Sequence, residues 1–435
     1  MSLAERILNG DPEAVQEAEI SLRDSAAVED VFELRRVLIK YYINWKGVRR
    51  DAGVNHLERN TDAALRHSRA FHEAYPDIPG IAYQLSSLLI DNGRHDEALQ
   101  LLEKLLASMT PDTLGLELRI LDSIARVLYV RGEFERTLAI FEQIFSRALK
   151  SNGQALNKEQ ESFFGSALAR VSRIHVNTGN YAEAVRVIEA FPYKIDLPLL
   201  NNTLARAHTL LRNGPPSQSA DARPVDLDHL TVACVKHGTK YGADYVNRLY
   251  AMVRRHLPGN WRFVCLTDDP QGISPEIDII DISALQTRGW WAKLALFDPQ
   301  TPFADQMIFY LDLDTVIVGD LGFIEGLKVG FYILEHAYTP GYNSSVMLFD
   351  RTFAEPVYDR FSSSDTDRLV GDQDWIQECM PGIDTFPREP IRLYKLLEPD
   401  ITSTDLARSN AKIVTFPTEP KPHQVPHGWV AEHWR

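Results

Sequence analysis

The spacing of apolar residues changes about halfway along the chain. Up to residue 213, apolar residues recur three and four positions apart with few β-branched runs, which predicts amphipathic helices. After residue 225, short runs rich in β-branched and aromatic residues appear, such as 230–235, 261–266 and 307–311. Such runs, separated by helix-like stretches, are typical of strands in an α/β domain. The pattern predicts two domains, an all-α domain followed by an α/β domain.

The segment between the two textures has the composition of a linker. It runs from Asn213 to Pro224 and is short, polar and rich in proline and glycine. Six of the seven tryptophans follow it. We therefore expect a helical domain at 1–213, a linker at 214–225 and an α/β domain at 226–435.

Three segments of the first half share one pattern. Each starts with a glycine, followed by a ring two residues on, a small residue five on and apolar residues six and nine on. The glycines are Gly93, Gly132 and Gly179, the rings His95, Phe134 and Tyr181, and the small residues Ala98, Thr137 and Ala184. Glycine permits a tight turn between two helices, and a small residue lets helices cross closely.

This pattern resembles the tetratricopeptide repeat, a helix-turn-helix unit that stacks into an α-solenoid. The resemblance implies a TPR-like solenoid that recruits an acceptor or a partner protein, with helical pairs around 31–42 and 62–74 capping the stack. A generic helical bundle is the alternative.

Charge and composition narrow the function classes. The net charge of the 435 residues is −14, of which −3 falls on residues 1–213 and −11 on the remainder. An acidic second half disfavours nucleic acid as a partner, because that partner needs a basic face. A small phosphate ligand remains compatible if a metal ion supplies positive charge. We find no apolar run long enough to span a membrane, no secretory signal, and only three cysteines, so we expect a soluble cytoplasmic protein.

The chemistry concentrates after the run 307–311. Asp312 and Asp314 follow this apolar strand at positions i and i+2, which point to the same face if the strand continues. Carboxylate oxygens suit Mg²⁺ or Mn²⁺, which keep positions open for phosphate oxygens. Two surface acids are the alternative interpretation.

Five segments then follow in an order that resembles GT-A glycosyltransferases, most closely the glycogenin-like group (family 8). They are a helix with Lys293, the pair Asp312 and Asp314, the run 342–349 with Asn343 and Ser344, the pair Asp372 and Gln373, and the run 413–423 with Lys421 and His423. Ser345 stands where the group usually has glycine. The resemblance covers 226–435 and implies a GT-A fold with a Rossmann-like mixed sheet.

The resemblance also implies roles for individual residues. Asp312 and Asp314 would hold Mn²⁺ or Mg²⁺, Lys421 and His423 would contact the diphosphate of the donor, and Asn343 and Asp372 would bind hydroxyls of its sugar. Lys293 and Ser344 are further candidate donor-binding residues. Tyr241, with Tyr245 as a rival, would flank the base, and Asp268 would accept from a uracil N–H. The candidate catalytic residues are Asp372, Gln373 and Asp374. Simpler readings are a solvated Lys421, a surface Lys293, and turn roles for Asn343, Asp372 and Asp268.

One departure from the group concerns the metal. Its metal-binding histidine would fall at Thr415, or at Pro417 after a shift of two residues. Either His423 replaces it as a ligand, the diphosphate supplies more ligands, or metal binding is weakened. The kinship implies retention of the anomeric configuration, by a nucleophile or by front-side attack.

The leading hypothesis is a metal-dependent hexosyltransferase using a nucleotide diphosphate sugar, with a UDP-sugar favoured. Its acceptor would be a protein side chain, a glycan or a lipid-linked saccharide. The alternative is a scaffold or sensor with partner-binding repeats and a degenerate sugar-nucleotide domain. A nucleotidyltransferase ranks last, because residues 237–240 are a poor phosphate loop.

Overall fold

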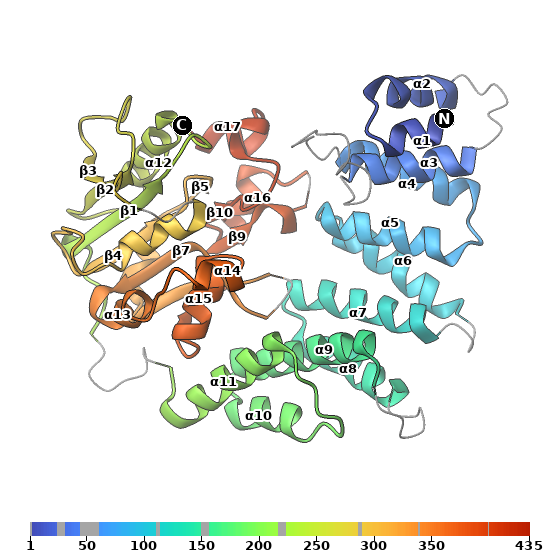
Figure 1. The fold of residues 1–435 in the computed structure, drawn as a ribbon, viewed down its shortest axis with the longest axis horizontal. Helices are drawn as coiled ribbons and strands as arrows, with labels where there is room; N and C mark the ends of the chain where they lie inside the picture. The colour runs from blue at the N-terminus through green and yellow to red at the C-terminus, as the bar shows by residue number, and fades with distance from the viewer. Residues whose placement is uncertain are drawn as a thin grey trace. The chain divides into compact units, whose positions relative to one another are not determined.

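The computed structural model describes residues 2–23, 31–43, 61–109, 114–148, 156–215, 223–285, 289–337, 340–398 and 400–435. The chain forms two compact units (Figure 1). The first comprises Met1–Ala148 with Lys395–Asp400, and the second Leu149–Tyr394 with Ile401–Arg435.

The first unit is built from helices whose apolar stripes pack on one another. Buried residues recur at helical spacing, as in Leu34, Val37, Leu38 and Tyr41 of one helix. Neighbouring helices along the chain pack together, for example α5 with α6 and α7 with α8. The helices are α1 (Leu3–Leu8), α2 (Pro12–Arg23), α3 (Val31–Tyr42), α4 (Thr61–Ala74), α5 (Pro79–Asp91), α6 (His95–Ala107), α7 (Leu114–Val130) and α8 (Phe134–Ala148).

The three glycines of the repeated pattern lie in the turns between helices. Gly93, Gly132 and Gly179 have φ values of 71°, 78° and 76°, a conformation that glycine adopts without steric cost. At Gly93 the space is also closed, since a Cβ there would lie 2.1 Å from the carbonyl oxygen of Leu397. The predicted helical first part is confirmed, whereas its assignment as a TPR-like solenoid stays a prediction.

Three helices belong to the compact unit that holds the sheet. They are α9 (Lys158–Asn177), α10 (Tyr181–Glu189) and α11 (Pro198–Asn213). The Arg173 guanidinium of α9 is 2% exposed, donates a hydrogen bond to the His336 carbonyl at 2.8 Å and lies 3.5 Å from the Glu335 carboxylate. The structure thus groups α9–α11 with the sheet. The predicted domain boundary at 214–225 lies after these helices, because it rests on amino-acid composition alone. Residues 216–222 of that segment lie outside the described residues.

The second unit is organised around a mixed seven-stranded sheet with the order β3-β2-β1-β4-β7-β6-β8. Strands β1 to β4 pair in parallel, and β7 pairs antiparallel with both β4 and β6. The same unit contains a second sheet, with three strands in the order β5-β10-β9. The strands are β1 (Leu230–Lys236), β2 (Arg262–Thr267), β3 (Asp278–Asp281), β4 (Met307–Leu311), β5 (Thr315–Ile317), β6 (Phe331–Glu335), β7 (Tyr342–Asp350), β8 (Asp384–Thr385), β9 (Ile391–Leu393) and β10 (Ile413–Thr415).

The predicted strand runs at 230–235, 261–266 and 307–311 are confirmed as β1, β2 and β4, which are nearly all buried. Helices α13 and α15 pack on β7, and α12 and α17 pack on β5. The remaining helices are α12 (Ala243–His256), α13 (Arg351–Asp359), α14 (Asp365–Arg368), α15 (Asp372–Cys379), α16 (Ser403–Arg408), α17 (Gly428–His433) and the 3-10 segments η3 (Leu227–His229), η4 (Gly289–Leu296), η5 (Leu321–Gly326), η6 (Tyr394–Leu396) and η7 (Pro422–Gln424).

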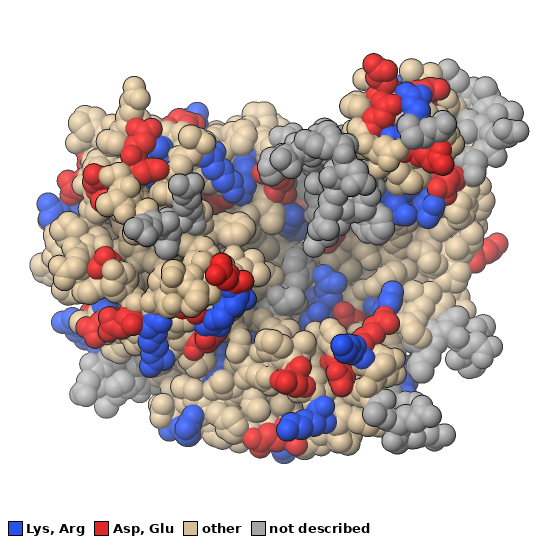
Figure 2. Space-filling model, viewed as in Figure 1, with Lys and Arg blue, Asp and Glu red and all other residues tan. Residues whose placement is uncertain are grey.

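On the face shown in Figure 2, side chains of both charge signs lie interspersed. Three lysines of the second unit are instead buried, Lys236 and Lys421 at 4% and Lys293 at 7% exposure. Among the described residues, no helix is both long and apolar enough to cross a membrane.

Candidate functional site

Asp312 and Asp314 lie where the chain passes from one sheet to the other. The segment Asp312 to Asp314 joins the end of β4, in the large sheet, to the start of β5, in the small one. The Asp312 N–H donates to the Ser345 carbonyl of β7 at 2.8 Å, and the Phe416 N–H donates to the Asp314 carbonyl at 3.2 Å. Backbone hydrogen bonds to both sheets therefore fix the two carboxylates.

A buried lysine holds the first carboxylate. Lys293 in η4 places its Nζ 3.0 Å from Oδ1 of Asp312 and 3.7 Å from Oδ2 of Asp372. The same ammonium donates to Oγ of Ser344 at 3.0 Å. The hydroxyl of Tyr310 also donates to Asp312, at 2.5 Å. Four segments distant in sequence thus meet at Lys293, which is not a surface lysine.

A second buried lysine holds the other carboxylate. The Nζ of Lys421 lies 2.6 Å from Oδ2 of Asp314 and donates to the Phe416 carbonyl at 2.7 Å. Strand β10 brings Lys421 there, because it pairs with β5 directly after Asp314. The Tyr241 hydroxyl donates to the same Oδ2 at 2.7 Å, while Oδ1 of Asp314 is buried and has no hydrogen-bond partner among the described residues.

The charges of this cluster do not balance. Three carboxylates, of Asp312, Asp314 and Asp372, meet two ammonium groups, so one negative charge is uncompensated. Burial raises the pKa of Asp314, with Asp312 adding to the effect and Lys421 opposing it. Burial also raises the pKa of Asp372 against the influence of Lys293. For Lys293, burial acts to lower the pKa, but the carboxylates outweigh it and raise the pKa. The site is therefore electrostatically suited to a further cation.

A row of rings extends from Asp314 along α12. Tyr241 and Tyr245 have ring centroids 4.7 Å apart, and Tyr245 contacts Trp434 at 5.1 Å. The Tyr245 hydroxyl hydrogen-bonds with Nδ1 of His423. Arg248 lies over the Trp434 ring at 4.3 Å and donates to its carbonyl at 2.8 Å. Trp434, near the C-terminus, thus packs on Tyr245 and Arg248 of α12, next to the residues predicted to flank the base.

Two of the predicted donor-binding residues are hydrogen-bonded to backbone N–H groups, Asp268 to the loop after β1 and Asn343 within β7. The carboxylate of Asp268 accepts from the backbone N–H of Gly238, with both oxygens at 3.1 Å. The side-chain oxygen of Asn343 accepts from the N–H of Ser345 at 2.9 Å, beside an irregularity in the β6–β7 pairing. Neither side chain contacts the lysine–carboxylate cluster through any described interaction.

The candidate catalytic residues begin α15. Asp372 is 3% exposed and belongs to the cluster through Lys293, whereas Gln373 and Asp374 are half-buried. The structure thus brings together Asp312, Asp314, Lys293, Ser344, Asp372, Lys421 and Tyr241. His423 joins them only through Tyr245 and Tyr241.

The oxygen donors fit Mg²⁺ or Mn²⁺ in kind, and the unpartnered Oδ1 of Asp314 is one such donor. The described residues contain no group of three His, Cys, Asp or Glu side chains placed to hold a metal ion. Thr415, where the family histidine would fall, is 2% exposed. The predicted set of Asp312, Asp314 and His423 therefore stays a prediction.

Sequence reasoning missed Tyr310. It was counted only as part of an apolar strand, yet its hydroxyl donates to Asp312. The signal was available, since Tyr310 lies two residues before Asp312 and alternate strand residues share a face.

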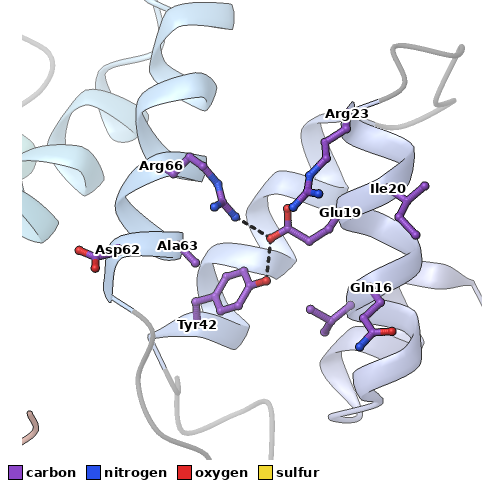
Figure 3. A pocket seen from close by; sticks show the side chains of 9 residues that line it. Gln16, Glu19, Ile20, Arg23, Tyr42, Asp62, Ala63 and Arg66 are labelled. Carbon is purple, nitrogen blue, oxygen red and sulfur yellow. Dashed lines mark hydrogen bonds and ion pairs between the residues drawn. The ribbon is translucent and has the colours of Figure 1, made fainter. Parts of the chain in front are cut away.

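A separate pocket of about 800 Å³, lined by both polar and apolar side chains, lies in the first unit between α2, α3 and α4. Figure 3 shows Glu19 at its centre, with Tyr42 and Arg66 directed toward it. Oε1 of Glu19 accepts from the Tyr42 hydroxyl at 2.6 Å and from Arg66 at 2.8 Å, and it lies 2.9 Å from Nε2 of His67. These hydrogen bonds connect α2, α3 and α4, so the Glu19 carboxylate has a structural role.

Comparison with known proteins gives distant likenesses. No family model matches the chain, and no curated protein matches it. Solved structures of the glycosyltransferase GlyE from Streptococcus pneumoniae TIGR4 are similar. One is 16% identical with a TM-score of 0.34, and the apo form is 14% identical with a TM-score of 0.33. Each likeness covers 44% of this chain and 55% of the other, so the chain spans about half the length of these structures.

Proposed function

We propose that this chain transfers a hexose from a nucleotide diphosphate sugar, with a UDP-sugar favoured, to a hydroxyl of an acceptor. The observation that carries the proposal is the buried cluster of two lysines and three carboxylates at the end of β4. It combines ammonium groups that can hold a diphosphate with carboxylates that can hold a divalent cation. The aromatic row of Tyr241 and Tyr245 beside it offers a surface for a base.

Charge supports metal dependence. The cluster already carries one uncompensated negative charge, and a diphosphate adds more. Mn²⁺ or Mg²⁺ held by Asp312 and Asp314, with phosphate oxygens as further ligands, would neutralise charge on the leaving diphosphate as a Lewis acid. Lys421 would then pass from Asp314 to a phosphate oxygen, keeping its charge next to the departing group.

The surroundings of Asp372 also bear on whether the transfer retains the anomeric configuration. In the transfer, the bond from the anomeric carbon to the phosphate oxygen breaks, and a bond to the acceptor oxygen forms. Asp372 is buried and bound to Lys293, which favours a positioning role for it. We propose retention by front-side attack, in which the leaving diphosphate takes the proton of the acceptor hydroxyl.

Thermal-shift titration of the full chain with UDP, GDP and their sugar conjugates, with and without Mn²⁺, tests the proposal. A ligand at about 100 times its dissociation constant adds about 2.7 kcal/mol of stability. We expect a Mn²⁺-dependent shift with one nucleotide, lost in Asp312→Ala and Asp314→Ala and kept in the control Asp359→Ala, an exposed residue of α13. Unchanged shifts and unchanged donor turnover in both site variants would contradict the mechanism.

A scaffold or sensor is the second candidate. It is favoured by His423, which is hydrogen-bonded to Tyr245, and by the lysines that already form ion pairs with Asp312 and Asp314. Donor binding without hydrolysis or transfer to any acceptor would support it. No shift with any nucleotide would remove the transferase and favour the scaffold, with the helical repeats, which we propose as the partner-binding part, as its functional region.

A further inference from the structure

An exposed apolar surface borders the buried cluster. The side chain of Trp290 is 60% exposed and that of Val370 is 77% exposed, although both lie in segments whose next apolar residues are buried. Trp291, which follows Trp290 in the chain, is 8% exposed and packs in the core. A Cβ on Gly371 would lie 3.7 Å from the Trp290 ring, so the indole rests against the backbone that follows Val370. We call Trp290, Val370 and Gly371 the indole platform.

The platform lies at the site because of the two elements that carry it. Trp290 precedes Lys293 by three residues in the 3-10 segment η4, where residues i and i+3 lie one above the other. Gly371 directly precedes Asp372, the first residue of α15. Lys293 and Asp372 contact each other, so the exposed indole lies one turn outward from that buried pair.

Two polar side chains with free hydrogen-bonding capacity follow Gly371 in the first turn of α15. Gln373 and Asp374 follow Asp372 in the first turn of α15 and are half-buried. Their side chains form no hydrogen bond with any described residue. An amide and a carboxylate left in this state are available to hydroxyl groups of a ligand.

This combination has a specific chemical complement. A pyranose ring has an apolar face of C–H groups, which packs on the electron-rich face of an indole, and a rim of hydroxyls for amide and carboxylate groups. An anionic ligand is disfavoured, because residues 214–435 carry a net charge of −11. We propose that the indole platform is the acceptor subsite and that the acceptor is a neutral saccharide, whose terminal pyranose stacks on Trp290. This inference rests on the proposed glycosyl transfer and names its acceptor class.

Binding of glycosides to the full chain tests it directly. Saturation-transfer difference NMR would be recorded with the methyl glycosides of glucose, galactose and N-acetylglucosamine, in the presence of UDP and Mn²⁺. The variants are Trp290→Ala, the conservative Trp290→Tyr, and the control Phe353→Ala, whose ring is 43% exposed on α13. Thermal unfolding without ligand shows whether each variant is folded.

We expect at least one glycoside to receive saturation at its ring C–H protons. Its affinity should fall about tenfold or more in Trp290→Ala, recover within about threefold in Trp290→Tyr, and stay unchanged in Phe353→Ala. The inference is overturned if no glycoside binds a wild-type chain that binds UDP, if Trp290→Ala binds as wild type does, or if only a peptide hydroxyl accepts sugar. Failure of UDP and its sugars to bind at all is a different result, because it removes the proposed function itself.

Discussion

Lys421 is the ion-pair partner of the Asp314 carboxylate. Both side chains are nearly buried, and their contact at 2.6 Å satisfies each charge. Removing one partner of a buried pair leaves a buried charge and costs about 3–5 kcal/mol. We therefore expect Lys421→Ala to lower the free energy of unfolding by that amount, as measured by chemical denaturation. The double variant Lys421→Ala with Asp314→Ala should regain much of the loss.

The same variant tests the preference for a cation. Without the ammonium, Asp314 loses its counter-ion and a bound cation becomes its main source of positive charge, so added Mn²⁺ should raise the melting temperature more in Lys421→Ala than in wild type. Equal effects of Mn²⁺ on the two proteins, or a Lys421→Ala chain as stable as wild type, would contradict this account of the cluster.

The residues of the site differ in how far sequence could predict them. Asp312 and Asp314 were found because two acids ending a buried apolar run are conspicuous. The pairing of Lys421 with Asp314 joins residues 107 positions apart and depends on β10 pairing with β5, which no local pattern encodes. The burial of Lys293 likewise follows from four segments meeting in space. Exposure of Trp290 was also hidden, since Trp290 and Trp291 look alike in an apolar run.

At the scale of elements, the helical pattern was informative because each turn carries its own signal. Glycines at positive φ and rings near the helix starts were readable one segment at a time. The affiliation of α9–α11 with the sheet was not readable, because it rests on tertiary contacts such as that of Arg173 with Glu335.

The start of α6 gives the first unit a sensitivity to acid. His95 is 4% exposed, and burial, with a smaller effect of Arg131, lowers its pKa to about 4. Its Nε2 has no hydrogen-bond partner among the described residues. The unfolded chain takes up a proton at the ordinary histidine pKa of about 6.5. As the pH falls from about 6.5 to about 4, His95 becomes protonated in the unfolded state but stays neutral in the folded state. The free energy of unfolding therefore decreases over this range.

Replacing this histidine by the ring found in a sister segment should remove the effect. Phe134 occupies the equivalent position, so His95→Phe restores an apolar ring. Its stability advantage over wild type should grow by about 3 kcal/mol between pH 7 and pH 4. Denaturation followed by circular dichroism at several pH values measures this, with His229→Phe, at an exposed position, as the control. An advantage that does not vary with pH would show that His95 is protonated in the folded state.

At the scale of the whole molecule, the extent of the sheet-bearing unit decides which fragment can fold. The predicted boundary at 214–225 makes residues 226–435 the domain, whereas the compact unit begins at Leu149. In that unit Asn177 of α9 donates to both Glu335 oxygens at 3.1 Å, and Arg206 of α11 lies 5.3 Å from the Tyr342 ring. Glu335 and Tyr342 flank the loop that leads into Asn343 and Ser344, so α9 and α11 support the strand that carries part of the site.

We therefore expect a chain of residues 149–435 to unfold in one cooperative transition and to keep any nucleotide-dependent shift of the full protein. A chain of residues 226–435 should melt at lower temperature and aggregate, because the surfaces of Glu335 and Tyr342 that α9 and α11 cover become exposed. In the full chain, Arg173→Ala should reproduce part of this loss, since it leaves the nearly buried Glu335 carboxylate without its guanidinium, whereas Arg212→Ala on the exposed face of α11 should not. Equal stability and equal nucleotide binding of the two truncated chains would place the boundary at the linker instead, and α9–α11 would then belong with the helices of the first unit.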